Sequence, residues 1–391
     1  IMANGTFRSS RISAILALSL LLVPETARAV NSEIISPAQA QIETARAALK
    51  RQPSSVKDFN SLAVGLTRRA RETGDVAYYQ EATKALEEAH RLDPGNRQTL
   101  RISAWVAMGK HEFARAYTLA RRFWRTCRED SWNLSVMGDA LMELGRYAEA
   151  ERIFQEMVDL RPGPSAYSRV AYLRETRGDL DGAMEMMQMA LSATDSRESE
   201  DRAWLMVQIA HLQEVSGNLA GSEASYRAAL SAFPGYHYAL AGLSELMLRQ
   251  GNAGDAAALA SKAIEAAPHA ERYLALADAL RASDKEQEAL EAEGTFEQLA
   301  LKNVESPDNE NHDLVLFYLQ RRPDPGRALS IARLEASRRQ DIHTLDRLAL
   351  ALEATGQERQ AKRLIRQILK IGTRDPLIVS HAAVMGLTGP S

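Results

Sequence analysis

Apolar side chains recur every three or four residues along most of the chain, and glycine interrupts this pattern at regular intervals. Such spacing places apolar side chains on one face of an α-helix, so the pattern predicts amphipathic helices. The glycines are 35, 36, 33, 39 and 34 residues apart, which predicts repeated helix pairs with a glycine at the turn. They are Gly74, Gly109, Gly145, Gly178, Gly217 and Gly251, and Gly356 repeats the phrase once more.

A small residue follows each glycine, usually five residues later, where we expect the two helices of a pair to cross. A small side chain there lets the helix axes approach to about 8–10 Å. One pair cannot bury its own apolar faces, so neighbouring pairs must stack into a single elongated array. The small residues are Ala82, Ala114, Ala150, Ala183, Ser222, Ala256 and Ala361.

The clearest copy of the repeat is residues 131–162, SWNLSVMGDALMELGRYAEAERIFQEMVDLRP. Its Gly138, Gly145, Ala150, Phe154 and Pro162 stand at the positions of a thirty-four-residue helix–turn–helix unit. This segment resembles the tetratricopeptide repeat, and the resemblance covers residues 57–376. It implies an all-α fold, a right-handed α-α superhelix of about eight to nine repeats.

Two copies depart from the pattern. An acidic, polar insertion, TDSRESEDR at 194–202, lengthens the spacing before Gly217. In the unit at 270–302, Asp284 stands in place of the glycine. These departures leave the repeat boundaries between 270 and 340 open.

The N-terminus has the pattern of a secretory signal peptide at residues 1–29. Arg8 and Arg11 precede an apolar run at 12–23, and Ala27 and Ala29 stand where a signal peptidase cleaves. The run is shorter than the roughly 20 residues of a membrane span, and no second run of that length occurs. We therefore expect an exported protein, periplasmic or extracellular after cleavage near Ala29, and not an integral membrane protein.

Two short segments flank the predicted array. Residues 30–56 contain a leading helix, with Ser36 as its N-cap and Pro37 in its first turn. Residues 377–391 form an apolar C-terminal helix or tail. This tail either docks on the last repeat or pairs with another subunit to form an oligomer.

Composition narrows the classes of function. Hydrophobic residues make up 45% of the 391, which excludes a disordered chain, and a formal net charge of −3 argues against a nucleic-acid binder. Cys127 is the only cysteine, which excludes a disulfide framework and a cysteine-based zinc site. No nucleotide-binding, serine-hydrolase or zinc-protease motif occurs, so we expect no enzyme, no cofactor and no metal site.

The resemblance implies that the first helix of each unit lines a concave groove through its second, fifth, ninth, twelfth and thirteenth positions. Aromatic side chains there would anchor a protein or peptide partner, and carboxylates would select a basic one. In the alternative interpretation, Trp132 and Trp204 pack between repeats and the carboxylates form a solvated face. The predicted groove residues are Trp132, Asp139, Glu143, Tyr172, Glu175, Trp204, His211, Glu214, Tyr238 and Glu245.

One subgroup of the family clamps acidic peptide ends with Lys at the fifth position and Asn at the ninth. The resemblance does not extend to that clamp. The ninth positions here are Arg68, Ser103, Asp139, Tyr172, His211 and Glu245.

Three hypotheses of function follow. The first is a non-catalytic exported scaffold that binds a protein or extended peptide in its groove, in cell-envelope assembly. The second is a structural subunit of a secretion or pilus assembly that docks by its repeat ends. The third, an enzyme acting on envelope polymers, has no motif in its favour.

Overall fold

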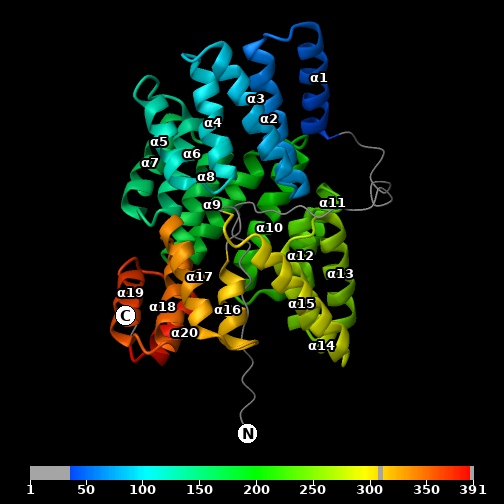
Figure 1. The fold of residues 1–391 in the computed structure, drawn as a ribbon, viewed down its shortest axis with the longest axis vertical. Helices are drawn as coiled ribbons and strands as arrows, with labels where there is room; N and C mark the ends of the chain where they lie inside the picture. Colours follow the sequence, from blue (N-terminus) through cyan, green and yellow to red (C-terminus); the bar gives the residue numbers. More distant parts are fainter. Residues whose placement is uncertain (1–35, 307–310, 388–391) are drawn as a thin grey trace.

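The computed structural model describes residues 36–306 and 311–387. Within these residues the chain forms twenty α-helices (Figure 1). The predicted signal peptide lies outside the described residues, and no described helix is long and apolar enough to cross a membrane. The helices are α1 (Pro37–Arg51), α2 (Val56–Thr73), α3 (Ala77–Leu92), α4 (Arg97–Gly109), α5 (Phe113–Trp124), α6 (Ser131–Glu143), α7 (Tyr147–Leu160), α8 (Pro164–Thr176), α9 (Leu180–Ala193), α10 (Ser199–Val215), α11 (Leu219–Ala232), α12 (His237–Arg249), α13 (Ala253–Ala266), α14 (Ala270–Arg281), α15 (Glu286–Lys302), α16 (His312–Gln320), α17 (Pro325–Arg338), α18 (Ile342–Ala354), α19 (Glu358–Leu369) and α20 (Pro376–Val384).

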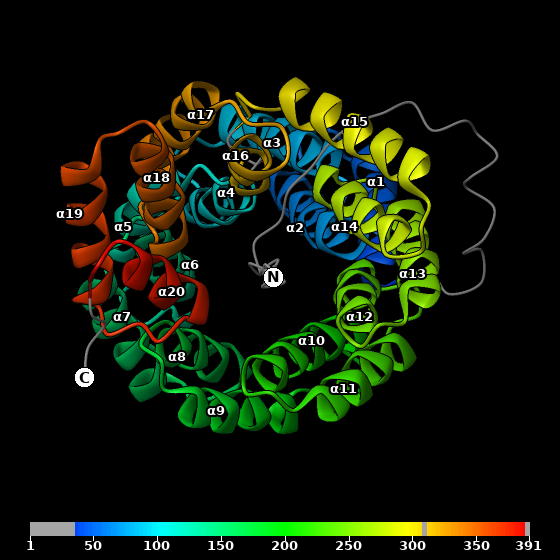
Figure 2. The same cartoon turned by 90° about the horizontal axis from the view of Figure 1, so that it is seen from below.

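The helices pack as consecutive pairs, from α2 with α3 to α18 with α19. The even-numbered helices form the inside of a ring and the odd-numbered helices its outside (Figure 2). The prediction of an all-α helix–turn–helix solenoid is therefore confirmed. The leading helix α1 begins where the sequence predicts, because Ser36 Oγ accepts a hydrogen bond from the backbone N–H of Gln39 at 3.1 Å.

The helices of a pair cross at small residues, as the repeat pattern predicts. Ala82, Ala150, Ala183 and Ala256 are each 0% exposed. Gly138 serves a related purpose, because a Cβ atom on it would meet Cε1 of Phe154 at 2.1 Å. The glycine therefore makes room for the aromatic ring of the second helix.

One unit has a different register from the one predicted. Gly109 ends α4, but its backbone does not adopt the left-handed conformation; His111 does, with φ of 56°. The small residue five positions beyond His111 is Ala116, which is 0% exposed, whereas Ala114 is exposed. The glycine spacing misled the prediction by two residues because a histidine takes the position that glycine occupies elsewhere.

Asp284 makes the turn of its unit at the position where the repeat pattern predicts a glycine. Asp284 adopts φ of 59°, the same left-handed conformation that Gly145 and Gly178 adopt at their turns. Aspartate is one of the few non-glycine residues that tolerate this conformation. The unit therefore keeps its turn without the glycine.

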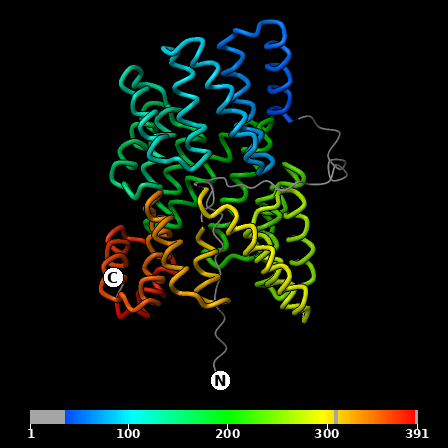
Figure 3. Tube along the Cα trace, in the orientation of Figure 1, coloured from blue at the N-terminus to red at the C-terminus, as the bar shows by residue number. Residues whose placement is uncertain are grey.

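The array winds through more than one turn, so its later helices lie against its earlier ones (Figures 1 and 3). The contacts between the first turn and the second join residues that lie 129 to 228 positions apart in the chain. His269 contacts Gly74 and Ile342 contacts Tyr147, and each of these pairs is 195 residues apart. The sequence pattern, which is local, did not predict these contacts.

Arg339, at the end of α17, forms the central polar contact between the turns. Its side chain is 2% exposed and donates to Nδ1 of His111 at 2.9 Å. The same guanidinium pairs with the carboxylate of Glu143 at 3.4 Å and lies over the ring of Phe113. Glu335 of α17 pairs with the same guanidinium at 3.0 Å, so Arg339 joins a carboxylate of each turn.

Backbone groups beside Arg339 join the inner helices end to end. The N–H of Gln340 donates to the carbonyl of Glu143, the last residue of α6, at 2.8 Å. The N–H of Ile342 donates to the hydroxyl of Tyr147 at 2.8 Å. A carbonyl at a helix end has no partner in its own helix, and the start of α18 supplies one. The arrangement also brings the positive end of one helix dipole to the negative end of another.

An apolar cluster continues across this boundary. Leu141, Met142 and Leu173 of the first turn belong to one buried cluster with Ile342 and Leu345 of the second. The C-terminal helix α20 belongs to the same cluster through its buried face. It therefore docks on the last repeat, which agrees with the first of the two interpretations of the tail.

We expect the glycines at turn-to-turn contacts to tolerate substitution worse than those elsewhere. Gly145 and Gly217 both have positive φ, at 69° and 82°. A Cβ atom on Gly145 would meet the carbonyl oxygen of Gln340 at 2.4 Å, whereas one on Gly217 meets nothing within 4 Å. Asn tolerates the left-handed conformation, so Gly217→Asn should cost about 1 kcal/mol or less. Gly145→Asn should cost about 1–3 kcal/mol more through overpacking.

Urea unfolding of both variants measures the difference. Equal losses of stability would show that the contact between the turns contributes nothing.

Candidate partner-binding surface

The inner helices place the four predicted aromatic groove residues in half-buried positions. Trp132 lies on α6, Tyr172 on α8, Trp204 on α10 and Tyr238 on α12, and all four are only partly accessible. Their helices share the inner side of the ring (Figure 2). Each side chain therefore divides its surface between neighbouring helices and solvent.

Trp132 belongs to an aromatic stack that the sequence analysis did not contain. Its ring meets Trp105 of α4 edge to face, with centroids 5.2 Å apart and planes at 70°. Arg101 lies over the Trp132 ring at 3.9 Å and pairs with Asp130 at 2.9 Å. Edge-to-face aromatic pairs and cation–π contacts both favour this geometry.

Trp105 was missed because of the register of its unit. Counting from Gly109 places Ser103 at the ninth position of the first helix. Counting from His111, which makes the turn, places Trp105 there. A buried small residue at Ala116 in place of Ala114 is the signal that corrects the count.

All four predicted aromatic residues pack against cores, and Trp132 contacts the cluster of the preceding repeats. Tyr172 packs against the cluster that joins the two turns, and Trp204 packs against the clusters on both sides of α10. The Tyr238 ring lies 4.0 Å from that of His237, and burial raises the pKa of its hydroxyl. For Trp204 the structure agrees with packing between repeats.

Three of the predicted carboxylates pair with side chains of the following repeat, two with an arginine and one with a histidine. Asp139 pairs with Arg169 at 2.6 Å, Glu175 with His211 at 2.9 Å, and Glu214 with Arg249. Each of these pairs joins one inner helix to the next. We call the series the inner ladder.

The inner ladder changes the expected chemistry of the surface. Burial raises the pKa of Asp139, and Arg169 opposes that rise. A basic partner would have to displace a cation that is already in place, at the cost of leaving it unpaired. The carboxylates therefore give little reason to expect a basic partner.

Two further predicted residues differ from the ladder. Glu143 is only 4% exposed and pairs with Arg339, so the prediction that it lines an accessible groove is wrong. The reason is the second turn of the superhelix, which covers the end of α6. Glu245 is half-buried on α12, where its charge adds to burial in raising the pKa of the Tyr226 hydroxyl.

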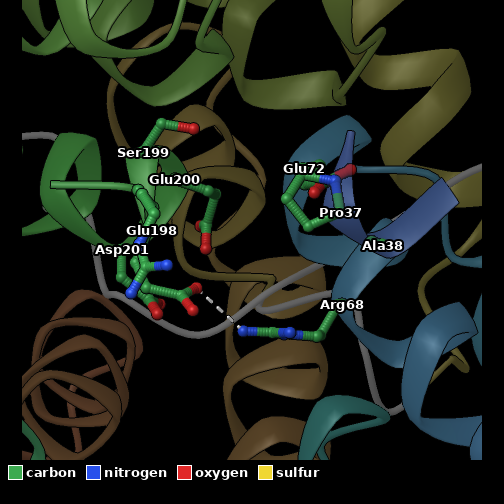
Figure 4. Close-up of a pocket in the computed structure, with 9 residues that line it drawn as sticks. Pro37, Ala38, Arg68, Glu72, Glu198, Ser199, Glu200 and Asp201 are labelled. Atoms are coloured by element: carbon green, nitrogen blue, oxygen red, sulfur yellow. Dashed lines mark hydrogen bonds and ion pairs between the residues drawn. The ribbon is translucent and has the colours of Figure 1, made fainter. Parts of the chain in front are cut away.

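A small cleft lies where the first turn meets the start of α10 (Figure 4). Arg68 crosses it to Glu198 at 3.0 Å. Behind it, Arg71 pairs with Glu200 at 3.1 Å and Asp201 at 3.3 Å. The acidic insertion therefore connects the two turns. The lining residues are Pro37, Ala38, Arg68, Glu72, Arg197, Glu198, Ser199, Glu200 and Asp201.

Two histidines of the second turn cap the end of α2. His237 Nε2 donates to the carbonyl of Arg71 at 3.3 Å, and His269 Nε2 donates to that of Gly74 at 3.2 Å. Arg272 donates to Nδ1 of His237 at 2.7 Å, which keeps that ring neutral. Burial, with the nearby Arg272 charge, lowers the pKa of both histidines well below the usual range.

Within residues 36–306 and 311–387, no three histidine, cysteine or acidic side chains are placed to hold a metal ion. Some histidines have structural contacts instead: His237 bonds to a helix-end carbonyl, and His211 bonds to Glu175.

Comparison with known proteins agrees with the fold. Residues 136–198 and 207–271 match the tetratricopeptide repeat family. No curated protein matches the chain by sequence.

Several solved structures are similar at low identity. The crystal structure of the APC/C hetero-tetramer Cut9–Hcn1 shares 13% identity with a TM-score of 0.54, over 90% of this chain and 60% of the matched one. Human IFIT1 with m7Gppp-AAAA shares 13% identity with a TM-score of 0.54, over 86% and 77% of the two chains. PilW, a type IV pilus biogenesis factor, shares 16% identity over 52% of this chain and 92% of its own, with a TM-score of 0.45. The first two likenesses show the fold alone, and the third supports no functional conclusion. This chain spans 60% of the matched Cut9–Hcn1 chain.

Replacing His237 and His269 with Gln should make the fold less sensitive to acid. Free histidine binds a proton below about pH 6.5, whereas the buried rings do so only at lower pH. Unfolding therefore takes up protons, and acid lowers the free energy of unfolding from about pH 7 downwards. Urea unfolding between about pH 7.5 and 5 should show a larger loss of stability for the wild type than for H237Q/H269Q.

Glu200 affects the pH dependence of stability in the opposite sense, which is why the wild type is compared with H237Q/H269Q. Burial raises its pKa to about 7 against the pull of Arg71, so it favours the folded state as the pH falls through 7. Glu200 is present in both chains, so the difference between them isolates the histidines. The same pH dependence of stability in the wild type and in H237Q/H269Q would contradict the lowered pKa of the two histidines.

Proposed function

We propose that this chain, a tetratricopeptide-repeat solenoid, is a non-catalytic scaffold that binds an extended segment of a partner protein along its inner helices. The observation that carries the proposal is the stack of Trp105 and Trp132 under Arg101. Tetratricopeptide repeats are typical of protein–protein interaction, and most are not catalytic.

The stack has the properties of an interface anchor. Trp and Arg are enriched among the residues that contribute most to binding free energy. The three side chains hold one another in place before any partner arrives, which lowers the entropy lost on binding. Both tryptophans stay partly accessible on adjacent inner helices, α4 and α6.

The inner ladder indicates what the partner segment offers in return. Two arginines neutralise Asp139 and Glu214, and Glu175 hydrogen-bonds with His211, so the ladder offers a partner few free carboxylates. We expect the partner to present aromatic or aliphatic side chains to the stack, rather than a run of lysines and arginines. Backbone groups of an extended segment would meet the remaining polar side chains.

We also propose that the protein acts outside the cytoplasm, in assembly of the cell envelope. The support is the sequence alone: Arg8 and Arg11, the apolar run at 12–23, and the small residues Ala27 and Ala29. A single cysteine suits an oxidising compartment because no partner for mispairing exists in the chain.

A second candidate is a structural subunit of a secretion or pilus assembly that docks by its repeat ends. Val384, at the end of α20, is 78% exposed, which favours this candidate. Ile378 and Ala382 on the same helix are buried against the last repeat, which removes most of the apolar surface that such docking would use. The scaffold proposal therefore has more support.

Peptides selected from a random dodecapeptide library displayed on phage provide the test. Those that the wild-type protein selects should bind W105A/W132A about thirtyfold more weakly, a loss of about 2 kcal/mol, by fluorescence anisotropy. W124A is the matched control, because Trp124 is also half-buried but lies on the outer helix α5. It should bind within about twofold of wild type.

Two results would contradict the proposal. One is the absence of any enriched peptide with the folded wild-type protein. The other is equal binding by wild type and W105A/W132A, with circular dichroism showing that both are helical.

A further inference from the structure

The outer helix α19 and its C-cap residue carry four cations in one line. Arg359, Arg363, Arg366 and Lys370 are spaced by four, three and four residues, which places them on one face of the helix. All four are exposed. The opposite face is buried through Ala361, Ile365, Ile368 and Leu369. We call these four residues the basic stripe; it extends over about 16 Å at 1.5 Å per residue.

The basic stripe has no carboxylate partner among residues 36–306 and 311–387. The one acidic residue on α19, Glu358, pairs with Lys362 instead, at 3.7 Å. Many other arginines of the protein are paired, as Arg177 is with Glu151 at 2.7 Å. Like charges four residues apart repel each other and destabilise a helix. An unpaired stripe therefore costs the free protein stability, and an external anion would recover it.

The shape around α19 restricts the class of that anion. The helix lies at the outer edge of the ring, on a convex side of the molecule (Figure 2). It contains no aromatic residue on which a base could stack, and single-stranded nucleic acid is bound mainly through such stacking in a groove. The overall charge of −3 also argues against a nucleic-acid binder.

The outer helix with the most carboxylates leaves little free acidic surface for the basic stripe of a second copy. Among the outer helices of the described residues, α15 has the most carboxylates. Four of them, Glu286, Glu288, Glu293 and Glu297, already pair with cations of the same chain. The basic stripe therefore has no complement on α15.

We propose that the basic stripe docks the solenoid on an anionic lipid surface. Lipid phosphates on a flat membrane suit a convex row of cations, and each cation near such a surface raises partitioning by about fivefold. The inference goes beyond binding on the inner helices, because α19 faces outward and the Trp105–Trp132 stack lies on inner helices. Docking through α19 would leave the inner face free for a partner.

Sedimentation with phospholipid vesicles tests the proposal with the full chain. Vesicles of phosphatidylcholine with about a third phosphatidylglycerol should bind the wild type. Vesicles of phosphatidylcholine alone measure any contribution of the apolar run at 12–23. R359Q/R363Q/R366Q should reduce partitioning to the anionic vesicles by at least tenfold, and added salt should have a similar effect.

Two control variants distinguish loss of the basic stripe from a change in net charge and from loss of folding. K50Q/R51Q/K57Q removes three exposed cations near α1 and should bind within about twofold of wild type. R359K/R363K/R366K keeps the charges and should retain binding, because lipid attraction does not need the guanidinium geometry.

Three outcomes would overturn the proposal. Wild type fails to bind the anionic vesicles; the α1 variant loses as much binding as the stripe variant; or the charge-retaining variant fails to bind although it is helical. Stripe-dependent binding to duplex DNA without binding to the vesicles would assign the stripe to nucleic acid instead.

Discussion

The end-to-end contact between the two turns of the superhelix is the interaction on which the rest of the structure depends. In an open solenoid each unit contacts only its neighbours. Here donors from the second turn cap the free carbonyls of the first, at Gly74 and at Glu143. The same contact buries Arg339, makes glycine necessary at 145, and withdraws Glu143 from solvent. It therefore decides which inner side chains a partner can reach.

The sequence predicted the fold well because the forces that make a repeat are local. Helix periodicity, small residues at crossings and glycine at turns are all visible within one unit, and the pairs formed as expected. The contacts between turns were not predictable in this way, because they join residues 129 to 228 positions apart and no local pattern records such distances. The acidic insertion was visible in the sequence, but its pairing with Arg71 was not. The register at His111 was missed because a buried contact with Arg339 holds a non-glycine residue in a left-handed turn.

For the candidate surface, too, the sequence predicted which helix carries each residue but not the contacts between helices. The family positions correctly placed the aromatic residues on inner helices, and Trp132 stands in the strongest cluster. The positions did not reveal that carboxylates on one helix meet cations on the next, because pairing depends on the angle between neighbouring repeats. Carboxylates that one helix presents on the inner side are paired with side chains of the next helix. Aromatic surface is not neutralised in this way, so it remains the better guide to binding.

The fixed distance between turns has a consequence for how this chain can change in evolution. An open array can gain or lose a unit because the remaining interfaces are unaffected. In this chain, loss of one unit between Gly74 and His269 would bring a different helix end opposite α2 and separate the caps from their carbonyls. The pairs from Gly74 to His269 and from Tyr147 to Ile342 overlap, so together they span most of the array. Duplication or deletion of whole units is therefore compatible with these contacts only near the ends of the array.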